Sequence, residues 1–467
     1  MSMVISPVVF YIISLVLIAG VLLDMHLMSS PKTATLGNKI GSASMLCAII
    51  LTLVYYNVSS LPLIAAALLL GSCAGVVIAV KVRMIHMPQT VAFLSCGGGA
   101  ASALIALAAV LNGNAVTPFS KFTAVLALVI GTLTFVGSFI AGGKLAGKME
   151  QRPVIYKGHT VIFVITVAIL AFICLAAIPL TLCPAFLLIT LGLALFLGYW
   201  FTIRIGGADM PITISFLNVF SGLAGGLAGM AIFEPLLVAI GGVVGAAGLI
   251  LTQIMCKAMN RPLWDILSGK TSTPAATKEN APAPDEPAAQ AEQSAVAGKA
   301  DIKAIVEAAQ TVIIVPGYGM ALAQAQHLVK TIADKLEEQG KEVLFAIHPV
   351  AGRMPGHMNV LLAEADVDYE KLQEMEEINP RFAEADLALV VGSNDVINPA
   401  AHSAEGTPIY GMPILEVEAA KHIIICNYDT KPGYAGVDNP LYHHVKAILL
   451  LGDAKETLEG LLTECGL

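Results

Sequence analysis

Residues 311–326, TVIIVPGYGMALAQAQ, predict both the fold of the second half of the chain and the kind of site it carries. Residues 312–315 are β-branched and uncharged, as in a strand buried on both faces of a parallel sheet. Gly317 and Gly319 follow directly, and good helix formers begin at Met320. Such a turn lets a pyrophosphate approach backbone N–H groups and the positive end of a helix dipole. The context favours a nucleotide site, and the alternative is a tight turn that only packs a helix on a sheet.

The sequence after residue 301 alternates between strand and helix patterns, which is typical of a parallel α/β sheet. We expect one helix to run from the glycine turn to about Gln339, where Gly340 ends it. We therefore predict a Rossmann-like domain over 301–467. Its further strands are predicted at 342–347, 387–391, 422–427 and 447–451.

The end of the second predicted strand bears on which nucleotide is bound. In the usual dinucleotide fold an acidic residue at this point holds the ribose 2′-OH of NAD. Here the strand ends in His348 and Pro349, and Arg353 lies beyond. With no carboxylate to repel a 2′-phosphate, these residues favour NADP over NAD. The alternative is that Arg353 only holds its own loop in place through a hydrogen bond. Asp395 follows the third predicted strand, at the sheet edge where ligands bind.

The first half of the chain is dominated by long apolar runs. Mean hydropathy over the whole chain is +0.78, and only 13% of residues are charged. Stretches of about 20 apolar residues recur, each long enough to cross a bilayer. The sequence thus predicts a polytopic α-helical membrane domain over 1–262. Its nine expected spans are 7–28, 37–56, 60–80, 88–111, 120–143, 159–178, 181–203, 209–232 and 234–257.

The basic residues between these spans predict the orientation. Lys and Arg concentrate in alternate connections, while the other connections hold almost nothing but Lys121. By the positive-inside rule, the N-terminus lies outside and everything after residue 260 is cytoplasmic. The first span lacks a charged leading region and a cleavage site, so we expect it to be retained. The basic residues in question are Lys32, Lys39, Lys81, Arg83, Lys144, Lys148, Arg152, Lys157, Arg204, Lys257 and Arg261.

Between the halves, residues 263–300 are predicted to be a flexible Ala/Pro-rich linker, since residues 268–300 offer almost no large apolar group to bury. The net charge of −8 and a pI near 5.7 argue against nucleic acid as a partner.

A few polar residues occur within the spans, where they are costly. Ser138 and Asn218 lie well inside theirs, and Asp209 lies at the mouth of the eighth. Each could belong to an ion path or simply bond to a neighbouring helix. A stripe of small residues in the eighth span predicts a close helix contact, and consists of Gly222, Gly225, Gly226 and Gly229.

Cysteine and histidine show no metal-binding spacing. We expect His348, His357 and His402 to be structural or on the surface. We expect the cysteines of the apolar runs to be small core residues, and these are Cys47, Cys73, Cys96, Cys174 and Cys256.

The two halves together resemble the β subunit of the proton-translocating NAD(P) transhydrogenase. The motifs that carry the resemblance occur in order across both halves: IGGADMP, SFLN, IMCKAMNRP, PGYGMALAQAQ, IHPVAGRMPGHMNVLLAEA, GSNDVINPA, GMPILEV and GYAGV followed by NPL. The resemblance implies an enzyme of the bacterial inner membrane that passes hydride from NADH to NADP⁺ as protons move from outside to the cytoplasm. This chain would bind NADP(H) and form most of the proton path. A partner α subunit would bind NAD(H), in a dimer of αβ units.

The resemblance also implies roles for individual residues. Asp395 would lie near the nicotinamide and help link proton and redox events, while Ser138, Asp209 and Asn218 would serve proton transfer and domain coupling. The remaining implied NADP(H)-binding residues are Pro316, Gly317, Tyr318, Gly319, Met320, Ala321, His348, Val350, Ala351, Gly352, Arg353, Gly392, Ser393, Asn394, Lys431, Gly433, Tyr434, Ala435 and Gly436.

Two positions depart from the family pattern. Ser95, in MPQTVAFLS, stands where many members have a histidine, so the proton path would use water or another titratable group such as His86. Many members also carry a Lys-Arg pair before GYAG that holds the 2′-phosphate. Here that segment reads NYDTKP and contains Asp429, so Lys431 or Arg353 would take over the task.

A transporter or channel with a nucleotide-sensing domain is the alternative function. It predicts internal symmetry or a filter motif in the first 260 residues, and the sequence shows neither.

Overall fold

The computed structural model describes residues 5–28, 31–56, 61–82, 86–150, 153–179, 182–206, 209–259, 262–267, 302–352, 356–407, 409–433 and 435–466. The chain divides into two compact units, one of residues 1–206 and 212–252 and one of residues 207–211 and 253–467. A short helix, α10 (Leu263–Leu267), occupies the first residues of the expected linker, and residues 268–301 lie outside the described part.

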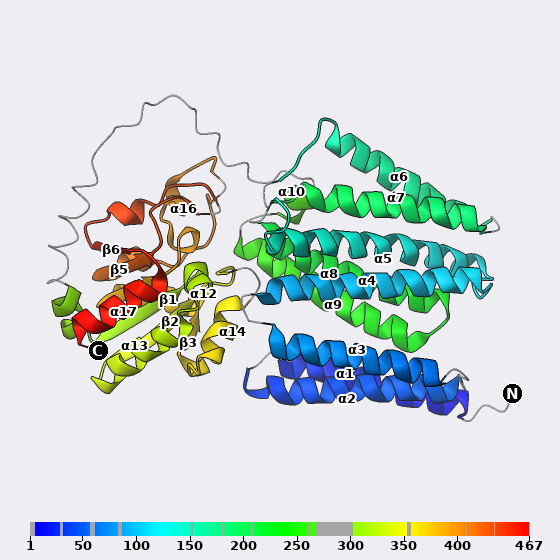
Figure 1. Ribbon diagram of the computed structural model, residues 1–467, viewed down its shortest axis with the longest axis horizontal. Helices are drawn as coiled ribbons and strands as arrows, with labels where there is room; N and C mark the ends of the chain where they lie inside the picture. Colours follow the sequence, from blue (N-terminus) through cyan, green and yellow to red (C-terminus); the bar gives the residue numbers. More distant parts are fainter. Residues whose placement is uncertain are drawn as a thin grey trace. The chain divides into compact units, whose positions relative to one another are not determined.

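Within the described residues, nine helices are long and apolar enough to cross a membrane (Figure 1), which confirms the expected spans. Their bounds are α1 Pro7–Met28, α2 Pro31–Tyr55, α3 Leu61–Lys81, α4 Met87–Leu111, α5 Pro118–Leu145, α6 His159–Ala176, α7 Pro184–Ile203, α8 Met210–Ala231 and α9 Pro235–Ala258.

Helix ends in this unit follow from local chemistry. The α5 helix begins with Pro118, whose fixed φ suits the first helical position, and the Thr117 hydroxyl accepts the Ser120 N–H at 3.0 Å. At the other end of α5, the buried Lys144 ammonium donates to the carbonyls of Ile203 and Ile205, at 2.6 and 2.9 Å. The cation therefore caps the end of α7 and complements its helix dipole.

Glycines let neighbouring helices approach to backbone contact. A Cβ on Gly222 of α8 would lie 2.7 Å from the Gly245 nitrogen of α9, and one on Gly229 would lie 2.9 Å from the Val238 nitrogen. Gly225 turns instead toward α4, with Ser102 Oγ 3.8 Å from its Cβ position. The stripe expected from the sequence is thus a helix-packing seam, as predicted.

The cysteine prediction was correct only in part. Cys96, Cys174 and Cys256 are buried, but Cys47 and Cys73 are exposed on this chain. A small apolar thiol suits an outward face of a membrane helix as well as a core, so composition alone does not separate the two.

The second unit contains a six-stranded, entirely parallel sheet of order β3-β2-β1-β4-β5-β6. This is the strand order of the doubly wound dinucleotide fold, with the order reversing between β1 and β4. The strand bounds are β1 Thr311–Pro316, β2 Glu342–Ile347, β3 Leu372–Glu374, β4 Leu387–Val391, β5 His422–Asn427 and β6 Ala447–Leu451.

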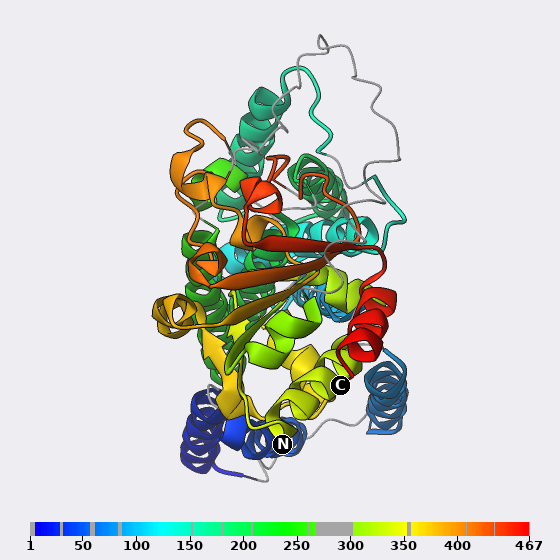
Figure 2. The ribbon, with the colours of Figure 1, turned by 90° about the vertical axis from the view of Figure 1, so that its left-hand side faces the viewer.

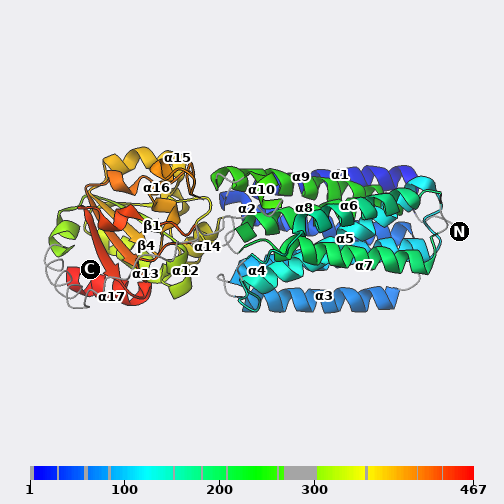
Figure 3. The ribbon, with the colours of Figure 1, turned by 90° about the horizontal axis from the view of Figure 1, so that it is seen from above.

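Helices cover both faces of this sheet. Figure 3 shows α15 (Met375–Ile378) and α16 (Ala400–Ser403) on one side of the strands, with α13 (Gln326–Glu338) and α17 (Ala454–Cys465) on the other. Figure 2 looks onto the same twisted strands, with the red α17 beside them. Alternate strand residues such as Ile313, Val390 and Ile425 pack in one core cluster beneath α15 and its neighbours. Burial on both faces explains why the strands are apolar runs and do not alternate with polar residues.

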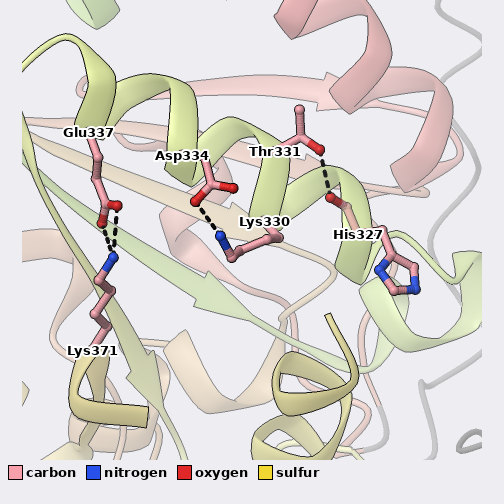
Figure 4. Close-up of polar contacts among 6 residues, drawn as sticks. All are labelled: His327, Lys330, Thr331, Asp334, Glu337 and Lys371. Atoms are coloured by element: carbon pink, nitrogen blue, oxygen red, sulfur yellow. Dashed lines mark hydrogen bonds and ion pairs between the residues drawn. The ribbon is translucent and has the colours of Figure 1, made fainter. Parts of the chain in front are cut away.

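The first helix after the glycine turn differs from the expectation. Instead of one helix there are two, α12 (Tyr318–Ala323) and α13, because Gln324 adopts a left-handed conformation with φ 52° between them. The edge strand β3 was also missed, since its three residues, Leu-Gln-Glu, carry no β pattern. Lys371, directly before β3, pairs with Glu337 of α13 at 2.6 Å (Figure 4), which ties this short edge strand to the sheet's covering helix.

Candidate functional site

The glycine turn after β1 is fastened to the turn after β4. The Gly317 N–H donates to the Val391 carbonyl at 2.8 Å, and the Gly319 N–H donates to the Gly392 carbonyl at 2.9 Å. These two amides therefore serve the architecture of the crevice. The sequence predicts that the turn offers N–H groups to a pyrophosphate, and any such contacts would come from the other groups of the same turn.

Glycine is required on both sides of this contact. A Cβ on Gly319 would lie 2.6 Å from the Gly392 Cα, closer than carbon atoms can approach. Gly392 also has φ +70°, a conformation that other residues rarely adopt. The two turns thus meet where the strand order reverses, which is the usual ligand position in such sheets, and we call them the crevice floor.

Ser393 adds a buried hydroxyl to this floor. It is 2% exposed, and its Oγ has no hydrogen-bond partner among the described residues. A Cβ on Gly317 would collide with this Oγ, so the hydroxyl lies against the glycine turn. A buried hydroxyl without a partner is costly, and a polar ligand atom at this point would satisfy it. The floor therefore fits a bound nucleotide.

The segment after β4 holds the loop that follows β5. The Asp395 carboxylate accepts the Ala435 N–H at 3.0 Å, and a Cβ on Gly433 would lie 2.5 Å from Asp395 Oδ1. The Asn394 amide donates to the Lys431 carbonyl at 2.9 Å, and the Asn398 amide donates to the Asp438 carbonyl at 3.2 Å. We call residues 431–438 the covering loop. Tyr434 within it lies outside the described residues.

Asn427 and Tyr442 support the segment after β4 through hydrogen bonds. The Asn427 amide donates to the Ser393 carbonyl at 2.8 Å and lies 2.7 Å from the Tyr442 hydroxyl. Burial raises the pKa of Tyr442 to about 12, so its hydroxyl stays neutral. The sequence reading missed both residues. Asn427 closes a predicted strand, so the rule that ligands gather at carboxyl ends could have found it.

His348 plays a structural part at the end of β2, as expected. It is 2% exposed, with Nε2 donating to the Pro413 carbonyl at 2.9 Å and Nδ1 accepting the Val350 N–H at 3.2 Å. Burial lowers the pKa of His348 to about 4, so the ring is neutral near pH 7. The loop then turns through Ala351 and through Gly352, at φ +102°. Arg353 lies outside the described residues.

The other two loop histidines differ from each other. His357, which begins α14 (His357–Glu364), is buried, whereas His402 is exposed and lies 3.1 Å from Glu416. Both fit a structural or surface role, as the sequence predicts.

Lys431 already has an acidic neighbour. Its ammonium lies 3.3 Å from the Asp429 carboxylate and its N–H donates to the same group at 3.1 Å. The Lys431 side chain is 83% exposed, so it can turn toward another anion at little cost.

In the helical unit, the structure joins Asn218 to Ser95. The Ser95 hydroxyl of α4 donates to Asn218 Oδ1 of α8 at 3.3 Å, so the position that departs from the family pattern contacts an expected site residue. Ser138 of α5 is 1% exposed, with no partner for its Oγ in the described ranges. Its neighbour Gly137 packs against Leu217, one residue before Asn218. Asp209 is buried just before α8 and belongs to the second compact unit. His86 is exposed just before α4.

The fold and these sites define a multi-pass membrane protein that carries a doubly wound domain of the dinucleotide-binding type. The family model for the NAD(P) transhydrogenase beta subunit matches residues 9–464 of the chain. Two curated relatives from Rhodospirillum rubrum, both named NAD(P) transhydrogenase subunit beta, are each 42% identical over 455 residues, which is 95% of this chain and 96% of each relative. The chain belongs to the NAD(P) transhydrogenase beta subunit family.

Proposed function

We propose that this chain is the NADP(H)-binding and proton-conducting subunit of an enzyme that transfers hydride from NADH to NADP⁺. NAD(H) binds a partner α subunit, and the complex is a dimer of αβ units in the bacterial inner membrane. Protons pass from outside to the cytoplasm. Residues 1–262 form the membrane domain, 263–300 a linker, and 301–467 the cytoplasmic nucleotide domain, with the N-terminus outside.

The observation that carries this proposal is the joined crevice floor and covering loop. Three side chains of one short segment, Asn394, Asp395 and Asn398, hold the covering loop by its backbone. A loop held in this way can keep a nucleotide in place and also release it when the contacts change. The family match over both units supports reading that release as the step coupled to protons.

When bound, NADP(H) supplies the nicotinamide carbon that accepts or donates the hydride. The chain's own residues bind and orient it. The Ser393 hydroxyl and the turn at 316–321 would hold the phosphate-ribose portion, and Asp395 would serve the nicotinamide end. Arg353 and Lys431 supply the positive charge for the 2′-phosphate, in place of the Lys-Arg pair common in the family. His348 and residues 350–352 shape the ribose side, while Gly433, Tyr434, Ala435 and Gly436 cover the site.

In the membrane, we propose that proton arrival changes the polar contacts of Asn218, Ser138 and Asp209. Asn218 gives and accepts hydrogen bonds but cannot be ionised, so it relays a proton only through water or a titratable neighbour. The nucleotide domain responds by tightening or loosening its hold on NADP(H) through the covering loop.

The test uses the αβ complex in sealed vesicles with a trapped pH dye. Asn218→Leu and Asp209→Leu should abolish proton movement that accompanies NADPH formation, while Asn38→Leu, at an exposed position of α2, should not. Normal proton movement in both site variants would refute the proposal. Calorimetry with NADPH and NADH separately tests the cofactor, and equal affinities would rule out the 2′-phosphate assignment.

A further inference from the structure

A buried carboxylate lies at the end of the helical unit away from Lys144 and Arg204. Glu234 sits in the short turn between α8 and α9, and its side chain is only 7% exposed. One oxygen, Oε2, accepts the Tyr56 hydroxyl at 2.6 Å. The other, Oε1, is buried with no hydrogen-bond partner in the described part of the chain. A buried carboxylate oxygen without a partner is costly, and a further donor at Oε1 would satisfy it.

The backbone is bent to bring this carboxylate inward. Phe233 has φ 57°, a left-handed conformation that a bulky residue rarely adopts, and the Glu234 N–H donates to the Gly229 carbonyl at 2.8 Å. A glycine would be the ordinary choice for this helix-ending position. Backbone strain of this kind is often found at functional sites, and here the residue that follows the strained position carries an ionisable group.

Tyr56 is held in place by aromatic packing. It follows α2, and its ring lies 6.5 Å from Phe10 and 5.0 Å from Tyr55, edge to face. Burial, followed by the neighbouring Glu234, raises the pKa of Tyr56, so the phenol is a neutral donor. The other titratable groups recorded around the pair are Tyr11 of α1 and Tyr55 of α2. No basic side chain pairs with Glu234 among the described residues.

Further polar groups follow the contact between α4 and α8. Beyond the Ser95–Asn218 bond, Ser221 Oγ lies against Gly98, and the Ser102 hydroxyl donates to the Gly98 carbonyl at 3.0 Å and faces Gly225. Residues 218, 221 and 225 share one helix face. From Asn218 to the end of α8 the helix rises about 20 Å, most of the distance across a bilayer core. Asn218 and Glu234 therefore lie at different depths.

We propose that Glu234, positioned by Tyr56, is the group that binds protons at the outer end of the helical unit before they move toward Asn218. The carboxylate takes a proton from outside water, becomes neutral, and gives it up inward. This inference rests on the proposed function and orientation, but names a residue that they do not require. The alternative is a purely structural role, in which the Tyr56–Glu234 hydrogen bond only ties the α1–α2 hairpin to the α8–α9 turn.

The test uses the αβ complex in vesicles whose nucleotide domains face the bulk solution, so that the lumen corresponds to the outside. NADPH formation is followed as lumen pH varies at fixed bulk pH. Glu234→Gln, which keeps the hydrogen-bond acceptor but cannot be ionised, should lower lumenal proton loss at least tenfold and flatten its dependence on lumen pH. Tyr56→Phe removes a hydrogen bond to the ionised form, so half-maximal proton loss should move to higher lumen pH. Glu150→Gln, an exposed carboxylate beyond α5, is the matched control.

Infrared difference spectra on changing lumen pH give a readout independent of turnover. A protonated-carboxyl band should appear in the wild type, be absent in Glu234→Gln and shift in Tyr56→Phe. The inference would be overturned if Glu234→Gln lost lumenal protons at the wild-type rate with unchanged pH dependence. It would also be overturned if the carboxyl band remained in that variant. If Asn218→Leu blocks proton movement while Glu234→Gln does not, only this inference fails. If the wild type moves no protons, the proposed function itself fails.

Discussion

The Asp395 carboxylate and the Ala435 backbone N–H, 40 residues apart in sequence, meet at 3.0 Å. This bond joins the carboxyl end of β4 to the covering loop after β5. A hydrogen bond to a charged acceptor contributes about 1.5–3 kcal/mol, enough to decide whether a short loop stays in place.

Asp395→Ala should loosen the covering loop and speed NADPH release by about tenfold or more, since each 1.4 kcal/mol corresponds to a factor of ten. Asp395→Asn keeps an acceptor oxygen and should have a smaller effect. Stopped-flow fluorescence of NADPH on the full complex measures the release rate. Asp438→Asn, an exposed carboxylate of the same loop, is the control. Equal release rates in Asp395→Ala and the wild type would contradict the bracing role.

Gly392→Ala should destabilise the nucleotide domain by at least about 2 kcal/mol, because it combines an unfavourable φ with a collision against Gly319. Thermal unfolding of the purified chain checks it. Gly460→Ala is the matched control, since Gly460 lies within α17 with nothing within 4 Å of its Cβ position. That change should stabilise the helix by up to about 1 kcal/mol. If Gly392→Ala left the free energy of unfolding unchanged, the two turns could separate without loss of stability.

His348 should make the domain sensitive to mild acid. The imidazole has its ordinary pKa of 6.5 in the unfolded chain and about 4 in the folded one, so the unfolded chain takes up the proton first as pH falls. Its contribution to stability is complete above pH 6.5 and is lost progressively between about 6.5 and 4, by about 3 kcal/mol in total. Denaturant unfolding across this range measures it.

His348→Gln should remove that pH dependence, because glutamine does not titrate there. His402→Gln, at an exposed histidine, should leave the slope unchanged. A wild-type slope that persists in His348→Gln would assign the acid sensitivity to another group.

The sequence predicted five of the six strands because each contains an apolar run of at least four residues between polar or turn-forming segments. It predicted the spans equally well because few charges interrupt them. The break at Gln324 and the three-residue β3 depend on tertiary contacts that local patterns do not encode. The same holds at the sites. Glycine spacing marked the crevice, but the bonds Asp395–Ala435 and Tyr56–Glu234 join positions 40 and 178 residues apart.

The Lys371–Glu337 pair should contribute about 0.5–1 kcal/mol to stability, since both side chains are roughly two-thirds buried and hold the edge strand β3. A double-mutant cycle with alanine isolates the coupling. The same cycle on Lys303–Glu307, a more exposed pair at 3.8 Å, should give a coupling near zero. Equal couplings would show that the geometry at β3 adds nothing.

The seam between α8 and α9 has a genetic consequence. Where Gly222 faces Gly241 and Gly245, each partner is already the smallest residue available. A substitution that enlarges one of them cannot be compensated by shrinking the other. Second-site suppressors of a Gly222 defect should therefore not arise at the opposing glycines, and a selection for revertants should recover true reversions or changes elsewhere that let the two helices separate.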